Sequence, residues 1–469
     1  MKLTKIVATV GPSVDSLDKM RSLIEEGVNL FRFNFSHGTL NEHLQKINWI
    51  RSLRDDGLEA GVFVDLGGPK FRLGEFGGDG KAYLEPGQTF RLTLREVEGN
   101  NLIAYAPLHQ VLDNLRPGDS ILLADGTIEL EVVEVKSEEV ITRVRIGGEV
   151  SSHKGINIPY RMGNISAITE KDIKDLQSGI NAGVNIFALS FVGSADDVVK
   201  AKEIAKSFGA EIYVISKIER AEALDNLRGI LDVSDAIMVA RGDLAVEIPY
   251  YKVPVVQKEL IAQALKKGRP VITATHMLRS ILYSPVPSRS EISDIANAVL
   301  DGSSALMLSE ETAIASNPVN SVAVMKRIIL EVEGYIRKNN LRKHVVGETG
   351  DLEMRIAESA VNLAISLNAK AIITPTASGA TALRVASLMP PVPIVAITES
   401  DNICEFLNLA YGVYPFKVKK MTGLGDMIEY IKPVLLNKGF VYPGDTVVIT
   451  AGYPFGKPGT TNMVKVEKI

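Results

Sequence analysis

Two neighbouring segments decide the fold: EIYVISKIE at Glu211–Glu219 and AIMVARGDLAVEIP at Ala236–Pro249. Each begins as a short apolar run rich in β-branched residues, which is typical of a strand buried on both faces. Charged residues then follow each apolar run directly. The charged residues are Lys217, Glu219, Arg241 and Asp243.

Charges at the ends of buried strands predict a ligand site. In α/β proteins, ligands bind in the crevice beyond the carboxyl ends of parallel strands. Two carboxylates beside a Lys and an Arg suit Mg²⁺ and an anionic, phosphorylated substrate. The same four residues could instead form ordinary salt bridges in a surface loop. The choice depends on whether other strands end in the same way.

Composition sets the class of protein. The chain has 469 residues, enough for about three domains, and 46% of them are hydrophobic. The net charge of −4 gives no sign of nucleic-acid binding. No signal peptide and no stretch of about 20 apolar residues is found, so no membrane association is expected. The single cysteine, Cys404, cannot form an internal disulfide, which fits a cytoplasmic protein.

Strand and helix patterns alternate through most of the first 345 residues, which is typical of a parallel α/β fold. Helical spacing occupies the intervals between the apolar runs, for example at residues 17–26, 40–54, 255–267 and 290–300. About eight such units predict a TIM barrel. A doubly wound sheet is the main rival, but nothing in the pattern marks a reversal of strand order. The predicted strands are residues 5–11, 29–37, 59–66, 184–192, 211–219, 236–240, 270–277 and 305–311.

The alternation breaks between residues 67 and 159. This stretch has short alternating runs between Gly, Pro and Asp turns and no good helix, so it predicts a small all-β domain inserted between a strand and its helix. On the loop face of a barrel, such an insertion is a candidate lid. The barrel is therefore predicted at residues 1–66 and 160–345, and a smaller three-layer α/β domain at residues 346–469.

In a barrel, all the strand ends share one mouth, and TIM-barrel active sites are built from several strand ends. The sequence therefore predicts a joint site. Its members are Arg32, Asn34, Ser36, Asp65, Lys217, Glu219, Arg241, Asp243, Thr275 and either Ser309 or Glu311.

The common phosphate-binding motifs are missing from this sequence: neither GxxxxGK[ST] nor a GxGxxG after a strand is found. The stretch TPTASG at residues 374–379 leads into a predicted helix and is a second candidate anion site. An ordinary helix cap is the alternative. His37, His153 and His276 lack metal-ligand spacing and are interpreted as contacts or packing residues.

A series of motifs in this order resembles the pyruvate kinase family over nearly the whole chain. The resemblance implies a barrel, an inserted β lid and a C-terminal α/β domain. The motifs are TKIVATVGPS, FRFNFSHG, KGINIP, ALSFV, ISKIE, VARGDLAVEIP, ATHML, SRSEISDIANAVLDG and MLSEETA.

The resemblance implies phosphoryl transfer from phosphoenolpyruvate to ADP, giving pyruvate and ATP in the last step of glycolysis. Glu219 and Asp243 would hold Mg²⁺ or Mn²⁺. Lys217 and Arg32 would face the transferring phosphoryl group, and the Gly242 and Asp243 amides would bind the substrate carboxylate. The other matching positions are Thr275 and Ser309, which would help protonate the enolate through water, and Pro12, Asn34, His37, Arg72 and Lys154, which would lie near the nucleotide.

One departure from the family pattern concerns a monovalent cation. Members that require K⁺ usually read DTKGPEIR where this chain reads DLGGPKFR at residues 65–72. Leu66 removes a hydroxyl, while Asn34, Ser36 and Asp65 still resemble cation ligands. The Lys70 ammonium could supply the missing charge, which gives the hypothesis that catalysis does not require K⁺. The alternative is a solvated Lys70 with K⁺ still bound.

The resemblance also implies regulation and assembly. The TPTASG stretch matches the family's effector-phosphate region, with Thr374, Thr376, Ser378 and Gly379 as candidate ligands of a phosphorylated allosteric effector. Family regulators include sugar phosphates and nucleoside monophosphates, and a homotetramer is expected. Three further departures stand near the mouth: Glu310 for Gly, His276 for Gln, and Gly193 for a common basic residue.

Two other classes of function stay open at this point. A Mg²⁺-dependent barrel lyase would need the Glu/Asp pair but no nucleotide lid, so the insertion and Lys217 count against it. A non-catalytic metabolite sensor would not need Lys217, Glu219 and Asp243, and all three are present.

Overall fold

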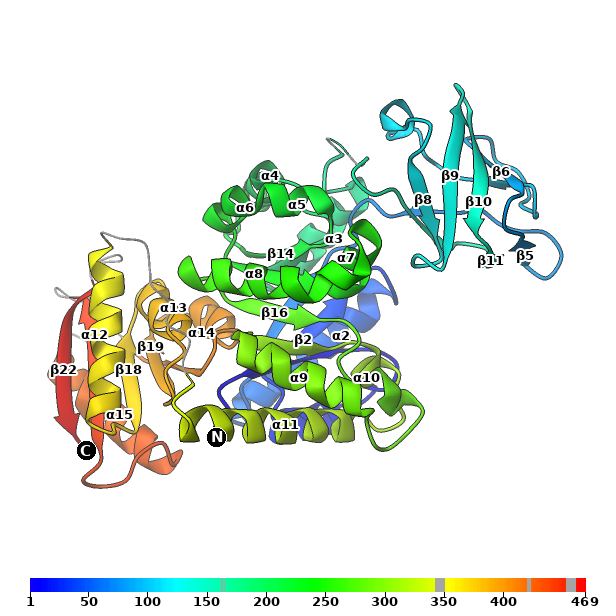
Figure 1. Cartoon of the computed structure of the whole chain (residues 1–469). Coiled ribbons are helices and arrows are strands. Elements are labelled where there is room, and N and C mark those ends of the chain that lie inside the picture. Colours follow the sequence, from blue (N-terminus) through cyan, green and yellow to red (C-terminus); the bar gives the residue numbers. More distant parts are fainter. Residues whose placement is uncertain (162, 164, 342–350, 420–422, 453–460) are drawn as a thin grey trace.

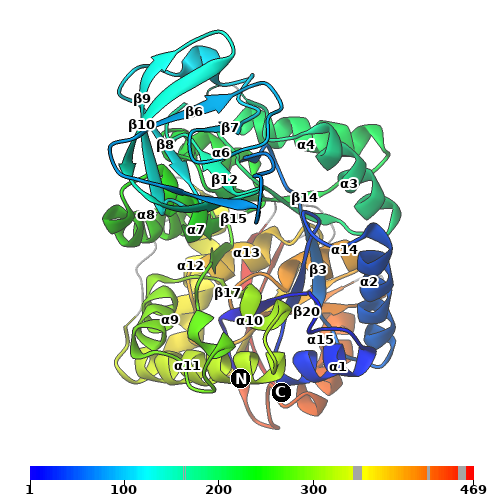
Figure 2. The ribbon, with the colours of Figure 1, turned by 90° about the vertical axis from the view of Figure 1, so that its right-hand side faces the viewer.

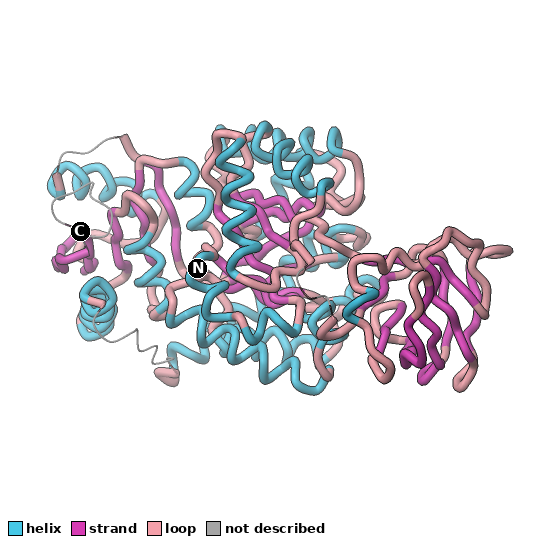
Figure 3. Tube along the Cα trace, turned by 90° about the horizontal axis from the view of Figure 1, so that it is seen from above, coloured by secondary structure: helices cyan, strands magenta, loops and turns pink. Residues whose placement is uncertain are grey.

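The computed structural model describes residues 1–161, 163, 165–341, 351–419, 423–452 and 461–469. A β-rich unit, a central barrel and a C-terminal α/β unit follow one another along the molecule (Figure 1 and, from above, Figure 3). The predicted boundary between residues 345 and 346 lies outside the described residues. No helix of the described part is long and apolar enough to cross a membrane.

The central unit is a closed barrel of parallel strands in the order β1-β17-β16-β15-β14-β13-β3-β2. This confirms the predicted TIM barrel and excludes a doubly wound sheet. The strands are β1 (Lys5–Thr9), β2 (Leu30–Asn34), β3 (Gly61–Asp65), β13 (Ile186–Leu189), β14 (Tyr213–Ile218), β15 (Ala236–Ala240), β16 (Val271–Ala274) and β17 (Ala305–Leu308).

Helices cover the outside of the barrel, and polar caps fix where several of them begin. In α3, Thr169 and Asp172 form a reciprocal capping box. The helices are α1 (Leu17–Glu26), α2 (Leu40–Asp55), α3 (Glu170–Asn181), α4 (Ala195–Ser207), α5 (Ala221–Asp225), α6 (Leu227–Val233), α7 (Arg241–Glu247), α8 (Val253–Lys266), α9 (Arg289–Asp301), α10 (Glu310–Ala313) and α11 (Pro318–Lys338), with 3-10 turns η2 (Tyr250–Lys252) and η3 (Arg279–Leu282).

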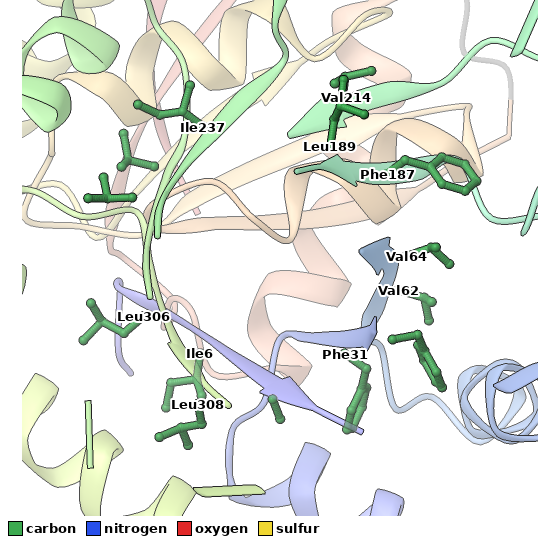
Figure 4. Close-up of a cluster of buried hydrophobic side chains, with 14 of the residues drawn as sticks. Ile6, Phe31, Val62, Val64, Phe187, Leu189, Val214, Ile237, Leu306 and Leu308 are labelled. Carbon is green, nitrogen blue, oxygen red and sulfur yellow. The ribbon is translucent and has the colours of Figure 1, made fainter. Parts of the chain in front are cut away.

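Two layers of apolar side chains hold the barrel together. Outward-facing residues such as Ile6, Phe31 and Leu306 pack against the helices (Figure 4). Inward-facing residues such as Val7 form a second core, which continues into Phe406 of the C-terminal unit. Because side chains alternate along a strand, the near-continuous apolar runs of the sequence supply both layers.

The β-rich unit, here called the β insertion, follows β3 and returns to the barrel before α3. Its sheets have a core of their own, and it contains one 3-10 turn, η1 (Leu112–Asn114). The strands are β4 (Phe71–Arg72), β5 (Lys81–Leu84), β6 (Thr89–Thr93), β7 (Ile103–Tyr105), β8 (Ser120–Leu123), β9 (Ile128–Val135), β10 (Glu139–Ile146), β11 (Gly148–Ser151) and β12 (Gly155–Asn157).

The C-terminal unit is a five-stranded sheet in the order β20-β19-β18-β21-β22, with only β22 antiparallel. The sequence did not predict β20 and β22. Pro415 argues against a strand, but β20 lies at the sheet edge, where Pro is tolerated. The elements are α12 (Leu352–Ser366), β18 (Ala371–Pro375), α13 (Ala380–Ser387), β19 (Ile394–Thr398), α14 (Asp401–Leu407), β20 (Val413–Lys417), α15 (Leu424–Asn437), β21 (Thr446–Gly452) and β22 (Thr461–Lys468).

A buried carboxylate ties the start of the chain to α11, close to the C-terminal unit. Glu333, which is 2% exposed, accepts hydrogen bonds from the backbone N–H groups of Leu3, at 2.9 and 3.0 Å, and Thr4, at 2.6 Å. The chain continues from these amides directly into β1. Glu333 therefore fixes the first barrel strand against the last barrel helix.

Replacing Glu333 with Leu leaves both amides buried without an acceptor. We expect Glu333→Leu to lower the free energy of unfolding by about 3 kcal/mol, since each lost partner costs roughly 1–3 kcal/mol. Glu331→Leu, at an exposed position of the same helix, should change it by less than about 0.5 kcal/mol. Urea unfolding followed by the fluorescence of the single tryptophan, Trp49, measures both variants. Equal losses in the two would contradict this role.

Candidate active site

The mouth of the barrel is organised around the carboxylate of Asp65 at the end of β3. Asp65 is 1% exposed and pairs with two cations, Arg32 Nε at 2.6 Å and Lys217 Nζ at 3.3 Å. Burial alone would raise the pKa of Asp65, but Lys217 and Arg32 outweigh it and hold that pKa below its ordinary value. Strands β2, β3 and β14 thus contribute to one buried charge cluster.

Lys217 stands at the centre of this cluster. Its Nζ donates to Ser190 Oγ at 2.7 Å and lies 2.9 Å from Glu219 Oε1. Burial would lower the pKa of Lys217, but the Asp65 and Glu219 carboxylates overcome this and raise it. Lys217 is therefore a permanent cation at neutral pH.

Glu219 and Asp243 form the predicted carboxylate pair. Glu219 is buried and accepts a hydrogen bond from the Phe191 N–H at 2.8 Å. Burial raises its pKa, Lys217 opposes this, and the negative charge of Asp243 adds to the rise. Two carboxylates that repel each other are a donor set that suits a hard divalent cation. Among the described residues no cluster of three or more His, Cys, Asp or Glu forms a metal site, so substrate and water would have to complete the coordination.

Arg241 and Asp243 directly follow strand β15, in the first turn of α7. The Arg241 side chain is held by its neighbours: its Nη1 pairs with Asp294 at 2.8 Å and its Nη2 donates to the Thr275 carbonyl at 2.6 Å. Asp243 pairs with Lys70 Nζ at 3.5 Å. Arg241 and Asp243 both line the cavity between the barrel and the β insertion, and Arg241 also supports the backbone that follows β16.

A cavity of about 1580 Å³ lies between the barrel and the β insertion. The insertion itself lies above α7 in Figure 2. The insertion approaches α7 closely at Gly126, where a Cβ would lie 2.8 Å from Val246 Cγ1 and φ is +84°. Only glycine fits such a contact. Predicted site residues and residues of the insertion line the same cavity: Lys70, Gly242, Asp243, Thr275, His276 and Glu310 beside Ser120, Asp125 and Thr127.

Thr275 lies at the end of β16 in a strained backbone. Its φ is +75°, and that of His276 is +57°. Left-handed conformations of non-glycine residues persist only where the surroundings enforce them, and here the Arg241 side chain holds the Thr275 carbonyl. Gly242 is equally constrained, since a Cβ there would lie 2.8 Å from Thr275 Cγ2.

Glu311 serves the neighbouring strand ends. Its carboxylate accepts from the N–H groups of Leu278, at 3.0 Å, and Ser309, at 2.7 Å. It is buried and joins the segments after β16 and β17. Of the two alternatives for the eighth strand, Glu311 is therefore occupied by backbone groups, whereas Ser309 is half-buried directly after β17.

The residues predicted around a monovalent cation lie beside Asp65. Asn34 is its register neighbour on β2, and the Asn34 Oδ1 accepts from the Ser36 N–H at 3.1 Å. The Leu66 side chain is buried, and its carbonyl accepts from Ser190 Oγ at 2.6 Å. Lys70 itself pairs with Asp243 rather than with Asp65.

The predicted nucleotide positions are dispersed over two surfaces. Arg72 and Lys154 are exposed on the β insertion, where Arg72 Nη1 donates to the His153 carbonyl at 3.0 Å. Pro12 and His37 are exposed on the barrel. Within the described part of the chain, the cavity lining includes none of these four.

The TPTASG loop precedes α13. Thr376 Oγ1 accepts from the Gly379 N–H at 2.8 Å, and Gly379 begins the helix with a φ of +85°. Ser378 is exposed, whereas Thr374 is fully buried in β18. The loop therefore presents the Ser378 side chain to solvent, while Thr376 holds the Gly379 amide.

Sequence reasoning missed Ser190. This residue directly follows β13, is 2% exposed, and joins Lys217 to the Leu66 carbonyl through its hydroxyl. The motif ALSFV contains it, and a polar residue at the end of an apolar strand was the available signal.

The closed barrel and the buried charges at its mouth define an enzyme of the (β/α)8 class. The family model described as "Pyruvate kinase, barrel domain" matches residues 1–322, and "Pyruvate kinase, alpha/beta domain" matches residues 354–467. A pyruvate kinase of Thermotoga maritima is 42% identical over 474 residues and covers 100% of both chains. Those of Methylorubrum extorquens and Corynebacterium glutamicum are each 39% identical, over 99% of this chain and 96% and 97% of theirs. The chain belongs to the pyruvate kinase family and is a phosphotransferase.

The Asp65 cluster makes a testable contribution to stability. Asp65→Asn keeps the volume but leaves Arg32 and Lys217 without their buried counter-charge, and it should lower the free energy of unfolding by about 3 kcal/mol at pH 7. The folded pKa of Asp65 is depressed, so this penalty should shrink as the pH falls below about 4. Asp56→Asn, in the exposed pair with Arg21, should cost less than about 1 kcal/mol. Urea titrations at several pH values measure both variants. Equal losses in the free energy of unfolding would contradict the stabilising role of the Asp65 cluster.

Proposed function

We propose that this protein transfers the phosphoryl group of phosphoenolpyruvate to ADP, forming pyruvate and ATP. The proposal depends on one arrangement: Arg32 and Lys217 both pair with buried Asp65, Lys217 also pairs with Glu219, and Asp243 lines the cavity under the β insertion. Phosphoryl transfer depends on charge neutralisation and positioning rather than on covalent chemistry from the protein. A cluster of fixed charges meets that requirement.

The divalent cation would be Mg²⁺ or Mn²⁺, held by Glu219 and Asp243. When bound, it supplies positive charge beside the substrate's carboxylate and phosphoryl oxygens. The Gly242 and Asp243 amides, in the first turn of α7, would receive the substrate carboxylate.

Lys217 and Arg32 would stabilise the transferring phosphoryl group, over whose oxygens negative charge spreads. The raised pKa of Lys217 keeps its ammonium charged for this role. Thr275 and Ser309 would orient the water that protonates the enolate at carbon. The strained backbone at Thr275 supports a positioning role there.

ADP would bind between the barrel and the β insertion. We assign residues 1–66 and 160–345 to the catalytic barrel and residues 67–159 to a lid. In this arrangement, Pro12, Asn34 and His37 contact the nucleotide from the barrel. Arg72 and Lys154 reach it when the insertion closes, which accounts for their present distance from the cavity lining.

Catalysis would not require K⁺. Arg32 and Lys217 already balance Asp65, and the Lys70 ammonium adds a third fixed positive charge near the same mouth, at Asp243. The cation position formed by Asn34, Ser36, Asp65 and the Leu66 carbonyl would then be dispensable.

Residues 346–469 would form the regulatory domain, with a phosphorylated effector at Thr376, Ser378 and Gly379. Thr374, buried in β18, would support the loop.

A homotetramer is proposed as well. Large apolar side chains are exposed on and beside η2, α8 and η3, and burying them between copies would be favourable. They are Tyr250, Tyr251, Val255, Tyr283 and Val286.

The proposal is tested by measuring pyruvate formation from phosphoenolpyruvate and ADP with Mg²⁺. The wild type should be active, and Lys217→Met should lose activity by about 10³-fold, because one charge at the transferring group is removed. Lys174→Met, at an exposed position on α3, is the control and should keep full activity. An inactive wild type, or an active Lys217→Met, would refute the proposal.

The K⁺ hypothesis has a separate test in the same assay. Rates with K⁺ and with tetramethylammonium should be equal for the wild type. Lys70→Glu should be slower by about tenfold in tetramethylammonium, since one charge interaction of about 1–2 kcal/mol is lost, and K⁺ should restore it. If the wild type is active only with K⁺, the proposed reaction still holds, but the hypothesis that Lys70 replaces K⁺ is wrong.

A further inference from the structure

A buried guanidinium belongs to the residue next to Glu219. Arg220 follows Glu219 in the chain and is 1% exposed. Its Nη1 donates to the Phe191 carbonyl at 3.4 Å, and its Nη2 donates to the Gly163 carbonyl at 3.0 Å. Gly163 lies on the chain that returns from the β insertion. The Arg220 side chain therefore joins β14, the segment after β13 and the segment that leads from the β insertion back to the barrel.

The site is shaped for this guanidinium. A Cβ on Gly193 would lie 2.8 Å from Arg220 Nη1 and 3.1 Å from Cζ, so any side chain at this position would displace the group. Gly193 does not have a positive φ. Glycine is thus required at position 193 because a side chain would collide with Arg220, and not because of its backbone conformation.

Phe191 links Arg220 to Glu219. Its φ of +56° is left-handed, which costs a bulky residue about 1–3 kcal/mol and requires contacts that enforce it. Its N–H donates to Glu219 Oε2 at 2.8 Å, while its carbonyl accepts from Arg220. The orientation of the Glu219 carboxylate therefore depends on a strained residue that Arg220 holds from the other side.

Stability alone does not account for burying this charge. In the described structure, Arg220 Nε has no hydrogen-bond partner, and its ion-pair partner, Glu222, has a buried Oε2 without one. Burying an incompletely paired guanidinium is costly. Such a cost is expected where a group serves a functional site.

We propose that Arg220 is a positioning residue: through Phe191 it orients Glu219 toward the divalent cation, and through Gly163 it anchors the return of the β insertion to the same point. The inference rests on the proposed function in one respect, that Glu219 holds the cation. It adds that metal affinity and the anchoring of the insertion are coupled through one guanidinium. Outer partners of metal ligands have this effect, and their loss typically weakens metal binding about 10–100-fold.

The test measures Mn²⁺ binding by the electron paramagnetic resonance signal of free Mn²⁺. Phosphoenolpyruvate is present to complete the coordination, and ADP is left out so that no turnover occurs. Arg220→Met keeps an unbranched apolar stem but removes the guanidinium with its charge and both hydrogen bonds, and it should raise the Kd for Mn²⁺ about tenfold or more. Arg220→Lys should be intermediate, because it retains the charge but cannot reach both carbonyls. Gly193→Ala should weaken binding in the same direction by displacing the guanidinium. Arg228→Met, at an exposed position on α6, is the control and should bind as the wild type does.

Anchoring of the insertion has its own readout. Trypsin cleavage after Arg161 should be faster in Arg220→Met and Gly193→Ala than in the wild type and the control. Variants that lose thermal stability but keep wild-type Mn²⁺ affinity would show a purely structural residue and overturn the inference. A wild type that binds no Mn²⁺ would instead refute the proposed function, so the two failures are distinguishable.

Discussion

The structure depends on one electrostatic constraint, the burial of the Asp65 carboxylate at the mouth of the barrel. A buried charge is tolerated only when it is paired, and Asp65 is balanced by Arg32 and Lys217 from the neighbouring strand β2 and from β14. Lys217 in turn fixes Glu219 and Ser190. The same pairing that makes the mouth stable therefore presents two permanent cations to any anion that enters it.

The barrel makes this arrangement possible because it brings distant segments to one place. Asp65 and Lys217 are separated by the whole β insertion, yet their strands end at the same rim. The insertion then forms one wall of the cavity, as the contact of Gly126 with Val246 shows. A closed sheet with a second unit over its mouth thus yields a site with fixed charges on one side and a separate domain on the other.

Much of this could be predicted from the sequence, because the apolar runs and the charges that end them are local patterns. The barrel, the inserted β domain and the joint placement of Arg32, Asp65, Lys217 and Glu219 follow from them. Contacts between distant segments could not be predicted. Ser190 and Arg220 acquire their roles only through partners on other strands, and the pairing of Lys70 with Asp243 depends on how the insertion sits on the barrel. Strand β20 was hidden by Pro415, whose edge position only the sheet order reveals.

In the proposed reaction, the charges around Asp65 would direct a phosphoryl group to a nucleotide rather than to water. Phosphorus NMR of a mixture of phosphoenolpyruvate, ADP, Mg²⁺ and the protein distinguishes these two outcomes. We expect the phosphoenolpyruvate resonance to be replaced by the three resonances of ATP, with little inorganic phosphate. Conversion to inorganic phosphate, or an unchanged spectrum, would contradict the proposed reaction.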